Sequence, residues 1–579
     1  MKLTDAFAIL LKKLKVKQVF GLQGGAVVHF FDSLERNKIK VTYTNHEQSA
    51  ALAGVAYAKS TENIGCVIVT TGPGSTNAIS GLLAAWQDSI PCLFISGQSR
   101  SNHVSYGKKV RQVGTQEANI CDIVRPITKY TKFIRKKETF VEEVIKATNI
   151  AKSGRPGPVW LDVPLEIQWS NIFFSKKIKI LDNKIKKNND SHLFEKTVKF
   201  FRTSKKPLLI LGFGARNSLK NIYNLKKLIL KYKIPFVTTW NAADLFPTNY
   251  PFNLGILGMS GQRGANKSVF KSDLLICLGT HLSIPHTTTL FENYAPKSRK
   301  IIVNIDQNQL KNLNVKFDLK INSDVNKFVN WLLKKNIKPY QWKYLNTFKR
   351  INWYTPKKNK YPNSNVFIKK LTEQVKERLC VVIDGGGTAL YAGFQSSVIK
   401  SKDRIICSSS ISSMGTGLAE TIGAWKSKKF KKIICIIGDG SFLMNIQDLQ
   451  TIAQDKINVS IVLINNNGYL AIRHTQKEFL NKRYFGTHPD GNLTMPSFKN
   501  VSKAFRLNYI KVNTHKDVQK AINFIKKTRT PSVCEVFVDE NQSSLFKQGY
   551  AANKDGTFSP QPLSEMYPFL KTPIANTNN

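Results

Sequence analysis

The sequence predicts an α/β protein made of three doubly wound parallel-sheet domains. Short apolar runs of strand length alternate with helix-like segments, which is typical of parallel sheets covered on both faces. Two polar stretches rich in lysine and asparagine divide the 579 residues into parts of domain size. The expected domains span 1–170, 190–335 and 363–545, followed by a tail over 546–579.

The first part contains five apolar runs that we expect to be strands. They cover 18–20, 41–44, 66–70, 92–96 and 159–163. Helices are expected over 47–59, with Asn45 as the N-cap, and over 75–87. Because these strands alternate with helices, the sequence predicts one parallel sheet here.

The other two parts follow the same pattern, with strands expected at 208–211, 236–238, 274–278 and 301–305, and then at 380–383, 433–437 and 459–464. Gly212-Phe213-Gly214 begins like a dinucleotide-binding loop, but Asn217 replaces the third glycine. A structural turn fits that segment equally well. Linkers are expected at 176–190 and 336–362.

The charge is unusual: 87 basic against 38 acidic residues give +49. The lysines are spread along the whole chain, without an arginine-rich arm or an aromatic-basic RNA motif, so we expect no specific nucleic acid. A basic surface would still attract anionic metabolites. No apolar stretch is long enough for a membrane span, and the eight scattered cysteines lack a C-x-x-C pair. These features predict a cytoplasmic protein with reduced thiols.

The segment 433–469 carries the clearest chemical signal. One strand ends in Gly438-Asp439-Gly440-Ser441, and the next ends in Asn465-Asn466-Asn467-Gly468-Tyr469. Parallel strands present their carboxyl ends at one sheet edge, where ligands bind. Asp439, Asn466 and the Gly468 carbonyl offer three oxygen ligands for Mg²⁺, and the helix opening at Gly440 and Ser441 suits a phosphate.

This G-D-G-S segment, followed 27 positions later by N-N, resembles the signature of thiamine-diphosphate enzymes. Such an enzyme needs a carboxylate against the pyrimidine ring, and Glu47 stands between a strand end and a helix start. Further motifs are similar to the acetolactate-synthase branch: Gly24-Gly25-Ala26, 71–77, 88–91, 96–98, 154–159 and 562–566.

The resemblance implies a pyrimidine-binding, a central and a diphosphate-binding domain. It makes Glu47 the activating acid and places Gln98 and Gln116 near the reacting carbon. Magnesium would be held by Asp439, Asn466 and Gly468. The remaining cofactor-binding positions would be Gly25, Pro73, Asn77, Gly386, Gly387, Thr388, Ser412, Met414, Gly440 and Ser441.

The implied activity is a carboligase of transferase type that decarboxylates a 2-keto acid, pyruvate above all, and passes the acyl anion to a carbonyl acceptor. The acceptor is a second keto acid or a keto-sugar. A simple 2-keto acid decarboxylase or an acyl-CoA lyase of the same family is the alternative. The resemblance also implies a homodimer or homotetramer with active sites at the subunit interface. The sequence leaves open the acceptor, the pathway and any regulatory subunit.

The chain departs from the acetolactate-synthase pattern at four places. Thr280-His281 stands where the family has an arginine that contacts substrate and FAD, so FAD is doubtful. Asp384-Gly385-Gly386-Gly387-Thr388 replaces the usual Gln-His pair of the diphosphate loop. Thr475 aligns with an acceptor-pocket tryptophan, and Thr115 with a phenylalanine. The cofactor residues are thus largely retained, whereas the substrate-reading positions differ.

Overall fold

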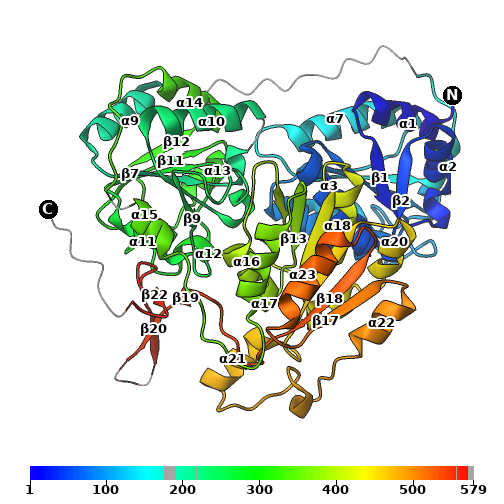
Figure 1. Cartoon of the computed structure of the whole chain (residues 1–579). Coiled ribbons are helices and arrows are strands. Elements are labelled where there is room, and N and C mark those ends of the chain that lie inside the picture. Colours follow the sequence, from blue (N-terminus) through cyan, green and yellow to red (C-terminus); the bar gives the residue numbers. More distant parts are fainter. Residues whose placement is uncertain (175–190, 217–218, 344, 554, 556, 571–579) are drawn as a thin grey trace. The chain divides into compact units, whose positions relative to one another are not determined.

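Three six-stranded sheets confirm the predicted fold class (Figure 1). The computed structural model describes residues 1–174, 191–216, 219–343, 345–553, 555 and 557–570, so the predicted linker at 176–190 and Asn217 lie outside the described residues. The chain divides into two compact units. One contains the first and third sheets, and the other contains the middle sheet with the C-terminal strands.

The first sheet has the strand order β2-β1-β3-β4-β6-β5, with every neighbouring pair parallel. Its strands are β1 (Gln18–Gly21), β2 (Lys40–Tyr43), β3 (Gly65–Val69), β4 (Cys92–Gln98), β5 (Tyr130–Phe133) and β6 (Val159–Pro164). The helices are α1 (Leu3–Lys13), α2 (Val28–Arg36), α3 (Glu47–Thr61), α4 (Pro73–Asn77), α5 (Ile79–Gln87), α6 (Ile120–Val124), α7 (Phe140–Lys152) and α8 (Leu165–Trp169).

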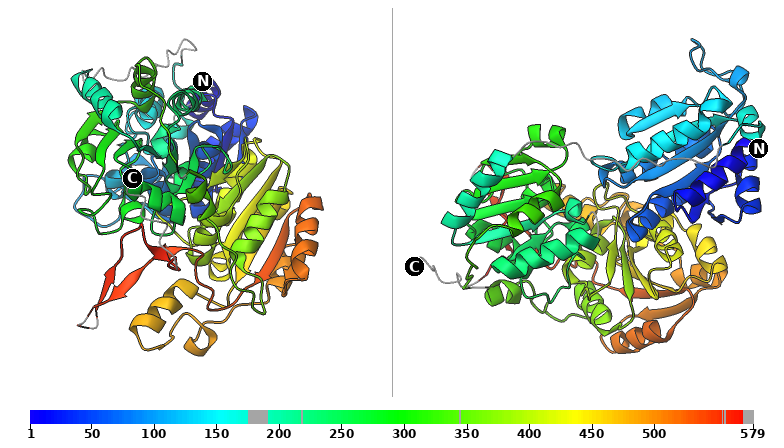
Figure 2. Two further views of the ribbon diagram at one scale, coloured as in Figure 1. Left: turned by 60° about the vertical axis from the view of Figure 1, so that its left-hand side comes forward. Right: turned by 90° about the horizontal axis from the view of Figure 1, so that it is seen from above.

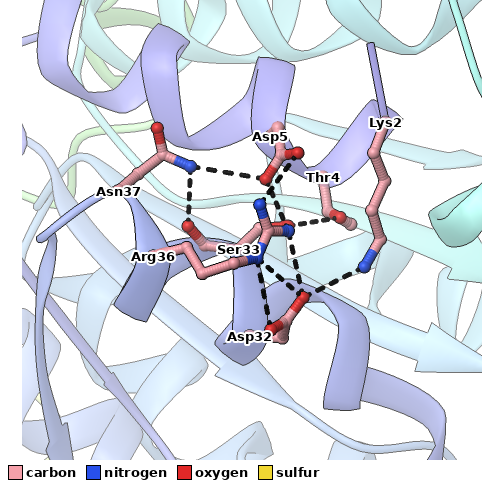
Figure 3. Close-up of polar contacts among 7 residues, drawn as sticks. All are labelled: Lys2, Thr4, Asp5, Asp32, Ser33, Arg36 and Asn37. Atoms are coloured by element: carbon pink, nitrogen blue, oxygen red, sulfur yellow. Dashed lines mark hydrogen bonds and ion pairs between the residues drawn. The ribbon is translucent and has the colours of Figure 1, made fainter.

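Charged side chains join α1 to α2 at the surface of this domain (Figure 3). Arg36 donates to the carboxylate of Asp32 at 3.0 Å and reaches Asp5 at 2.8 Å. Lys2 donates to the same Asp32 at 3.2 Å. Because Asp32 and Arg36 are about half exposed, their contacts contribute little to stability.

The third sheet repeats the order of the first, as β14-β13-β15-β16-β18-β17. Its strands are β13 (Leu379–Ile383), β14 (Arg404–Ile406), β15 (Lys432–Gly438), β16 (Val459–Asn465), β17 (Asn508–Val512) and β18 (Ser532–Phe537). Helices in this part of the chain are α16 (Ser364–Gln374), α17 (Gly387–Ser396), α18 (Thr416–Lys426), α19 (Asp439–Met444), α20 (Asp448–Gln454), α21 (Leu470–Phe479), α22 (Phe498–Ala504) and α23 (Asp517–Lys527).

The middle sheet has a different order, β12-β11-β10-β7-β8-β9. Its strands are β7 (Pro207–Leu211), β8 (Phe236–Thr238), β9 (Asn253–Ile256), β10 (Leu274–Leu278), β11 (Arg299–Asn304) and β12 (Leu319–Asn322). Neighbouring residues such as Ile276 and Cys277 belong to two separate cores, so helices cover both faces, as Figure 2 shows. These helices are α9 (Ser191–Thr203), α10 (Leu219–Tyr232), α11 (Arg263–Lys271), α12 (Ile284–Thr287), α13 (Gln307–Lys311), α14 (Val325–Leu333) and α15 (Leu345–Arg350).

The segment expected to be an extended tail contains two small antiparallel sheets. They pair β19 (Lys547–Gln548) with β22 (Met566–Tyr567) and β20 (Tyr550–Ala552) with β21 (Phe558–Pro560). All eight cysteines are buried. Among the described residues, no helix is both long and apolar enough to cross a membrane.

Local details differ from the sequence expectations at helix ends. The cap of α3 is His46, whose ring accepts from the Gln48 amide at 3.1 Å, whereas the predicted cap Asn45 donates to Thr451 at 3.3 Å. The helix expected over 75–87 is two helices that meet at Ala78.

Helices α3 and α18 approach each other closely because small residues lie at their contact. A β-carbon at Gly423 would lie 2.0 Å from the carbonyl oxygen of Ala53, so only glycine fits. Later in α3, the Lys59 ammonium donates to the Cys407 carbonyl at 2.7 Å and lies 4.0 Å from Glu420. Later residues of α3 thus meet earlier residues of α18, and the two helices run in opposite directions.

Candidate active site

Polar side chains gather at the carboxyl ends of β13, β15 and β16. Asp384, Asp439 and Asn466 each follow directly on a buried strand. Since neighbouring parallel strands end at one edge, the sheet register brings these residues together. This is the edge that the sequence predicts for the magnesium and diphosphate residues.

Asp439 organises the predicted metal loop. One carboxylate oxygen accepts from the amides of Asn466 at 3.1 Å and Gly468 at 3.0 Å, and the other accepts from Gly440 at 2.8 Å. Burial nevertheless raises the pKa of Asp439 to about 6. The structure therefore places all three predicted metal-binding residues in one hydrogen-bonded loop.

Asn466 supplies the observation that points to a cation. Its amide nitrogen donates to the Thr388 hydroxyl at 3.3 Å, but its buried side-chain oxygen has no hydrogen-bond partner among the described residues. An orphaned buried amide oxygen is costly unless a ligand satisfies it. Together with the Asp439 carboxylate, this donor set fits Mg²⁺, which prefers oxygen ligands.

Several of the predicted diphosphate residues lie close to one another. A β-carbon at Gly386 would lie 2.5 Å from the Ser441 hydroxyl and 2.7 Å from the Met414 side chain. Met414 is thus brought to the loop that contains Gly386, Gly387 and Thr388. Gly440 and Ser441 lie in the first turn of α19, whose amides face the same edge. Ser412 adopts a positive φ of 49°, two residues before Met414.

Two residues of this region were not predicted. The buried Asp384 accepts from the amides of Gly386 at 3.1 Å and Gly417 at 3.0 Å, and burial raises its pKa to about 6. Arg473 donates to the Asn466 carbonyl at 2.7 Å and so braces the metal loop. A signal existed for Asp384, which directly follows an apolar strand, but none for Arg473, which lies in a helix pattern.

A second group lies in the first domain around Glu47. The side-chain amide of Asn77 donates to its carboxylate at 3.1 Å, and a β-carbon at Gly74 would lie 3.3 Å from its other oxygen. Pro73 starts the helix that ends at Asn77. Gly25 starts a short 3-10 helix after β1, and a β-carbon there would meet no atom of the described residues within 4 Å. The residues predicted to contact the pyrimidine therefore lie at one sheet edge.

Gln98 is buried with both ends of its amide engaged. Its oxygen accepts from the Thr71 hydroxyl at 2.8 Å, and its nitrogen donates to the Asp162 carboxylate at 3.0 Å and to the Ala118 carbonyl at 2.8 Å. This amide has no capacity left for a reacting group. We therefore propose that Gln98 positions its neighbours rather than touching substrate.

Gln116 has the opposite character. Its side chain is exposed, its φ is +58°, and its carbonyl accepts from the Thr71 hydroxyl at 3.0 Å. A non-glycine residue with positive φ is uncommon and is often held in place by its surroundings. The backbone of Gln116 is thus fixed beside the Glu47 group while its side chain stays available.

The two groups are separated within one chain. About 9 Å of helix joins Ala53 to Glu47, and about 10 Å joins Gly423 to the start of α18 next to Met414, at about 1.5 Å per residue. Because α3 and α18 run in opposite directions, these lengths add to a separation on the order of 20 Å. One chain alone does not bring Glu47 to the diphosphate residues.

Comparison with known families identifies this arrangement. Residues 1–123 match "Thiamine pyrophosphate enzyme, N-terminal TPP binding domain", residues 194–332 match the central domain, and residues 385–536 match the C-terminal TPP binding domain. The chain belongs to the thiamine pyrophosphate enzyme family. Glu47 falls within the first matched range, and Asp439 and Asn466 fall within the last.

Proteins similar to this thiamine pyrophosphate enzyme include three acetolactate synthase large subunits. That of Porphyra purpurea is 32% identical over 563 residues, covering 93% of this chain and 92% of the relative. The Cyanidium caldarium subunit is 32% identical over 583 residues, covering 94% and 95%. The isozyme 2 large subunit of Escherichia coli (strain K12) is 28% identical over 530 residues, covering 91% and 93%.

Proposed function

We propose that this thiamine pyrophosphate enzyme is a carboligase that joins the acyl group of a 2-keto acid, such as pyruvate, to a carbonyl acceptor. The proposal rests on two observations together: Glu47 is hydrogen-bonded to Asn77, and the Asn466 side-chain oxygen of the metal loop has no hydrogen-bond partner within the described part of the chain. The likeness of nearly the whole chain to acetolactate synthase large subunits supports it.

The overall reaction consumes a proton. Pyruvate loses its carboxylate as CO₂, a carbon–carbon bond forms to the carbonyl carbon of the acceptor, and the acceptor oxygen takes the proton. Bound thiamine diphosphate supplies the electron sink that stabilises the acyl anion. Asp439, Asn466 and the Gly468 carbonyl would hold Mg²⁺, and the amides at Gly387 and Ser441 would bind phosphate oxygens with the Thr388 hydroxyl. The amides of Gly386 and Gly440 already donate to Asp384 and Asp439, so these two glycines would shape the loops around the diphosphate.

Glu47 would hold and release a proton at its carboxylate, next to the pyrimidine. Asn77 fixes that carboxylate by donating to it. Met414 is a large apolar side chain beside the phosphate loop and would brace the cofactor. These residues would hold the Glu47 carboxylate and the cofactor in place before any substrate binds.

The active unit would be at least a homodimer. Since Glu47 and the diphosphate residues are on the order of 20 Å apart along α3 and α18, a complete site needs Glu47 from one chain and Asp439 from another. A tetramer built from such dimers contains the same sites. We propose this assembly from the helix packing together with the family resemblance.

The acceptor remains a choice between a second keto acid and a keto-sugar. FAD is not part of this proposal, because Thr280-His281 stands where the family has an arginine that contacts it. The absorbance spectrum of the purified protein distinguishes a flavin-containing enzyme from one without it. A decarboxylase or an acyl-CoA lyase would differ in product.

Purified protein with pyruvate, Mg²⁺ and thiamine diphosphate tests the proposal. We expect CO₂ release, and a carbon–carbon bonded product when a second keto acid or a keto-sugar is added. Aldehyde or acyl-CoA as the sole product would favour the alternatives. The absence of CO₂ release under all of these conditions would contradict the proposed activity.

A further inference from the structure

An unusually basic loop follows β4 in the first domain. We call residues 99–116 the basic loop. Arg100, Lys108, Lys109 and Arg111 all lie in it, and all are exposed. Four permanent cations within a dozen residues repel one another unless anions compensate them.

No carboxylate compensates these cations among the residues that the structure describes. None of the four forms an ion pair there: Arg100 lies 5.3 Å above the Trp169 ring, and Lys108 contacts only the Asn102 carbonyl at 3.4 Å. Glu117, the acid next to the loop, is already engaged. Its two oxygens accept from the amides of Ser105 at 2.6 Å and Val113 at 2.5 Å.

Glu117 also gives the basic loop a defined shape. The carboxylate accepts from the amides of both Ser105 and Val113, so it holds the two ends of the segment between them together. This segment contains Lys108, Lys109 and Arg111. Tyr106 adds a second attachment, since its hydroxyl accepts from the Cys121 amide at 3.2 Å. The three central cations are therefore presented on a tethered segment.

The base of the basic loop is part of the Glu47 surroundings. Thr71 donates to the Gln116 carbonyl at 3.0 Å, and a β-carbon at Gly72 would lie 2.2 Å from that same oxygen. Gly72 directly precedes the helix whose last residue, Asn77, donates to Glu47. The loop is thus built on the short segment that also positions the proposed activating acid.

We propose that the basic loop binds the phosphate group of a carbonyl acceptor, through Lys108, Lys109 and Arg111. This rests on the proposed carboligase activity and names its acceptor class, a phosphorylated aldehyde or keto-sugar. A 2-keto acid carries one carboxylate and needs one or two cations. A phosphate carries up to two charges and accepts several charge-assisted hydrogen bonds, which suits a cluster of lysine and arginine.

The kinetic experiment compares two acceptors that differ only in phosphate. Holoenzyme saturated with thiamine diphosphate, Mg²⁺ and pyruvate is supplied with glyceraldehyde 3-phosphate or glyceraldehyde. We expect KM to be lower for the phosphorylated acceptor by about tenfold or more, and this advantage to shrink as salt is added. Equal KM values at low salt would overturn the inference.

A variant and a matched control locate the effect. Lys108→Gln/Lys109→Gln/Arg111→Gln should bring the ratio of the two KM values close to one. Lys520→Gln/Lys526→Gln/Lys527→Gln removes three exposed cations from α23 and should leave the ratio of the parent. The same loss of preference in both variants would show that net charge acts, not the basic loop.

A binding measurement without turnover uses the loop's own cleavage sites. Trypsin cuts after exposed lysine and arginine, so we expect cleavage of the holoenzyme at Lys108, Lys109 or Arg111. Glycerol 3-phosphate should slow it several-fold, and glycerol should not. A loop that resists trypsin in the assembled protein without any phosphate would instead be covered by a partner chain, which would overturn the inference.

The two proposals fail in different ways. A parent protein that releases no CO₂ from pyruvate contradicts the carboligase activity itself. A parent that releases CO₂ but shows neither phosphate preference nor phosphate protection retains that activity and loses only the acceptor class.

Discussion

Asn77 donates a hydrogen bond to Glu47 across 3.1 Å, so that the last residue of α4 orients the first residue of α3. The bond satisfies one carboxylate oxygen and leaves the other beside Gly74. A small residue at that position keeps space open next to the acid. The pair therefore has the form expected of a positioned proton carrier.

Glu47→Gln should lower the rate of CO₂ release from pyruvate by about 100-fold or more, because an amide cannot exchange the proton. Glu35→Gln, which neutralises an exposed acid on α2, should keep the activity of the parent. Thermal unfolding should show both variants folded. A fully active Glu47→Gln protein would remove this residue from the mechanism.

Mixing two inactive variants tests the intersubunit site. Glu47→Gln and Asp439→Asn should each be inactive alone, whereas a mixed dimer contains one site with both native residues. Random reassortment should restore about a quarter of the parent activity. Native mass spectrometry confirms that mixed dimers formed. Mixed dimers without activity would mean that each chain supplies both residues to its own site.

Gly423→Ala should destabilise the protein by about 1–3 kcal/mol or more, because the new methyl group would meet the Ala53 carbonyl at 2.0 Å. Urea unfolding measures the change. Gly438→Ala is the matched control, since a β-carbon there meets nothing within 4 Å and its φ of −84° suits alanine. Equal stability of both variants would contradict the close contact of α3 with α18.

Asp162→Asn should change how stability depends on pH. Burial raises the pKa of Asp162 to about 7, above its ordinary value of 3.8. Folding then takes up a proton between these values, so this group makes the parent less stable as pH rises, by up to about 1.4 kcal/mol per pH unit. Relative to the parent, the variant should gain stability between about pH 4 and pH 7.

Chemical denaturation at several pH values measures this difference. A constant offset between variant and parent would reflect only the lost hydrogen bonds to Ser96, Gln98 and Tyr106. The predicted result is that the unfolding free energy of the variant, relative to that of the parent, increases as the pH rises. A difference independent of pH would mean that Asp162 is ionised throughout the range.

Much of the fold was predictable because it rests on local patterns. Asp439 and Asn466 end two apolar runs, and strand register alone then brings them together. Cys66 and Cys435 lie in strands, as their apolar neighbours indicate. The break between α4 and α5 at Ala78, by contrast, leaves no clear mark in a sequence rich in helix formers.

The rest depended on residues that are distant in sequence. Gln98 donates to Asp162, which lies 64 positions further along the chain. Asn45 has the right residue type for an N-cap, but the capping position before α3 is His46, and Asn45 instead donates to Thr451 of α20. Neither contact follows from propensity or periodicity, since both require knowing which elements pack together.

The shared strand order of the first and third sheets has a consequence for the origin of the chain. Helix α3 follows the second strand of its sheet, and α18 follows the second strand of the other, so equivalent helices pack in opposite directions. Two identical ancestral domains that formed a two-fold symmetric dimer would have this kind of self-complementary interface. The middle sheet, with its own order, would then be a later insertion between duplicated halves.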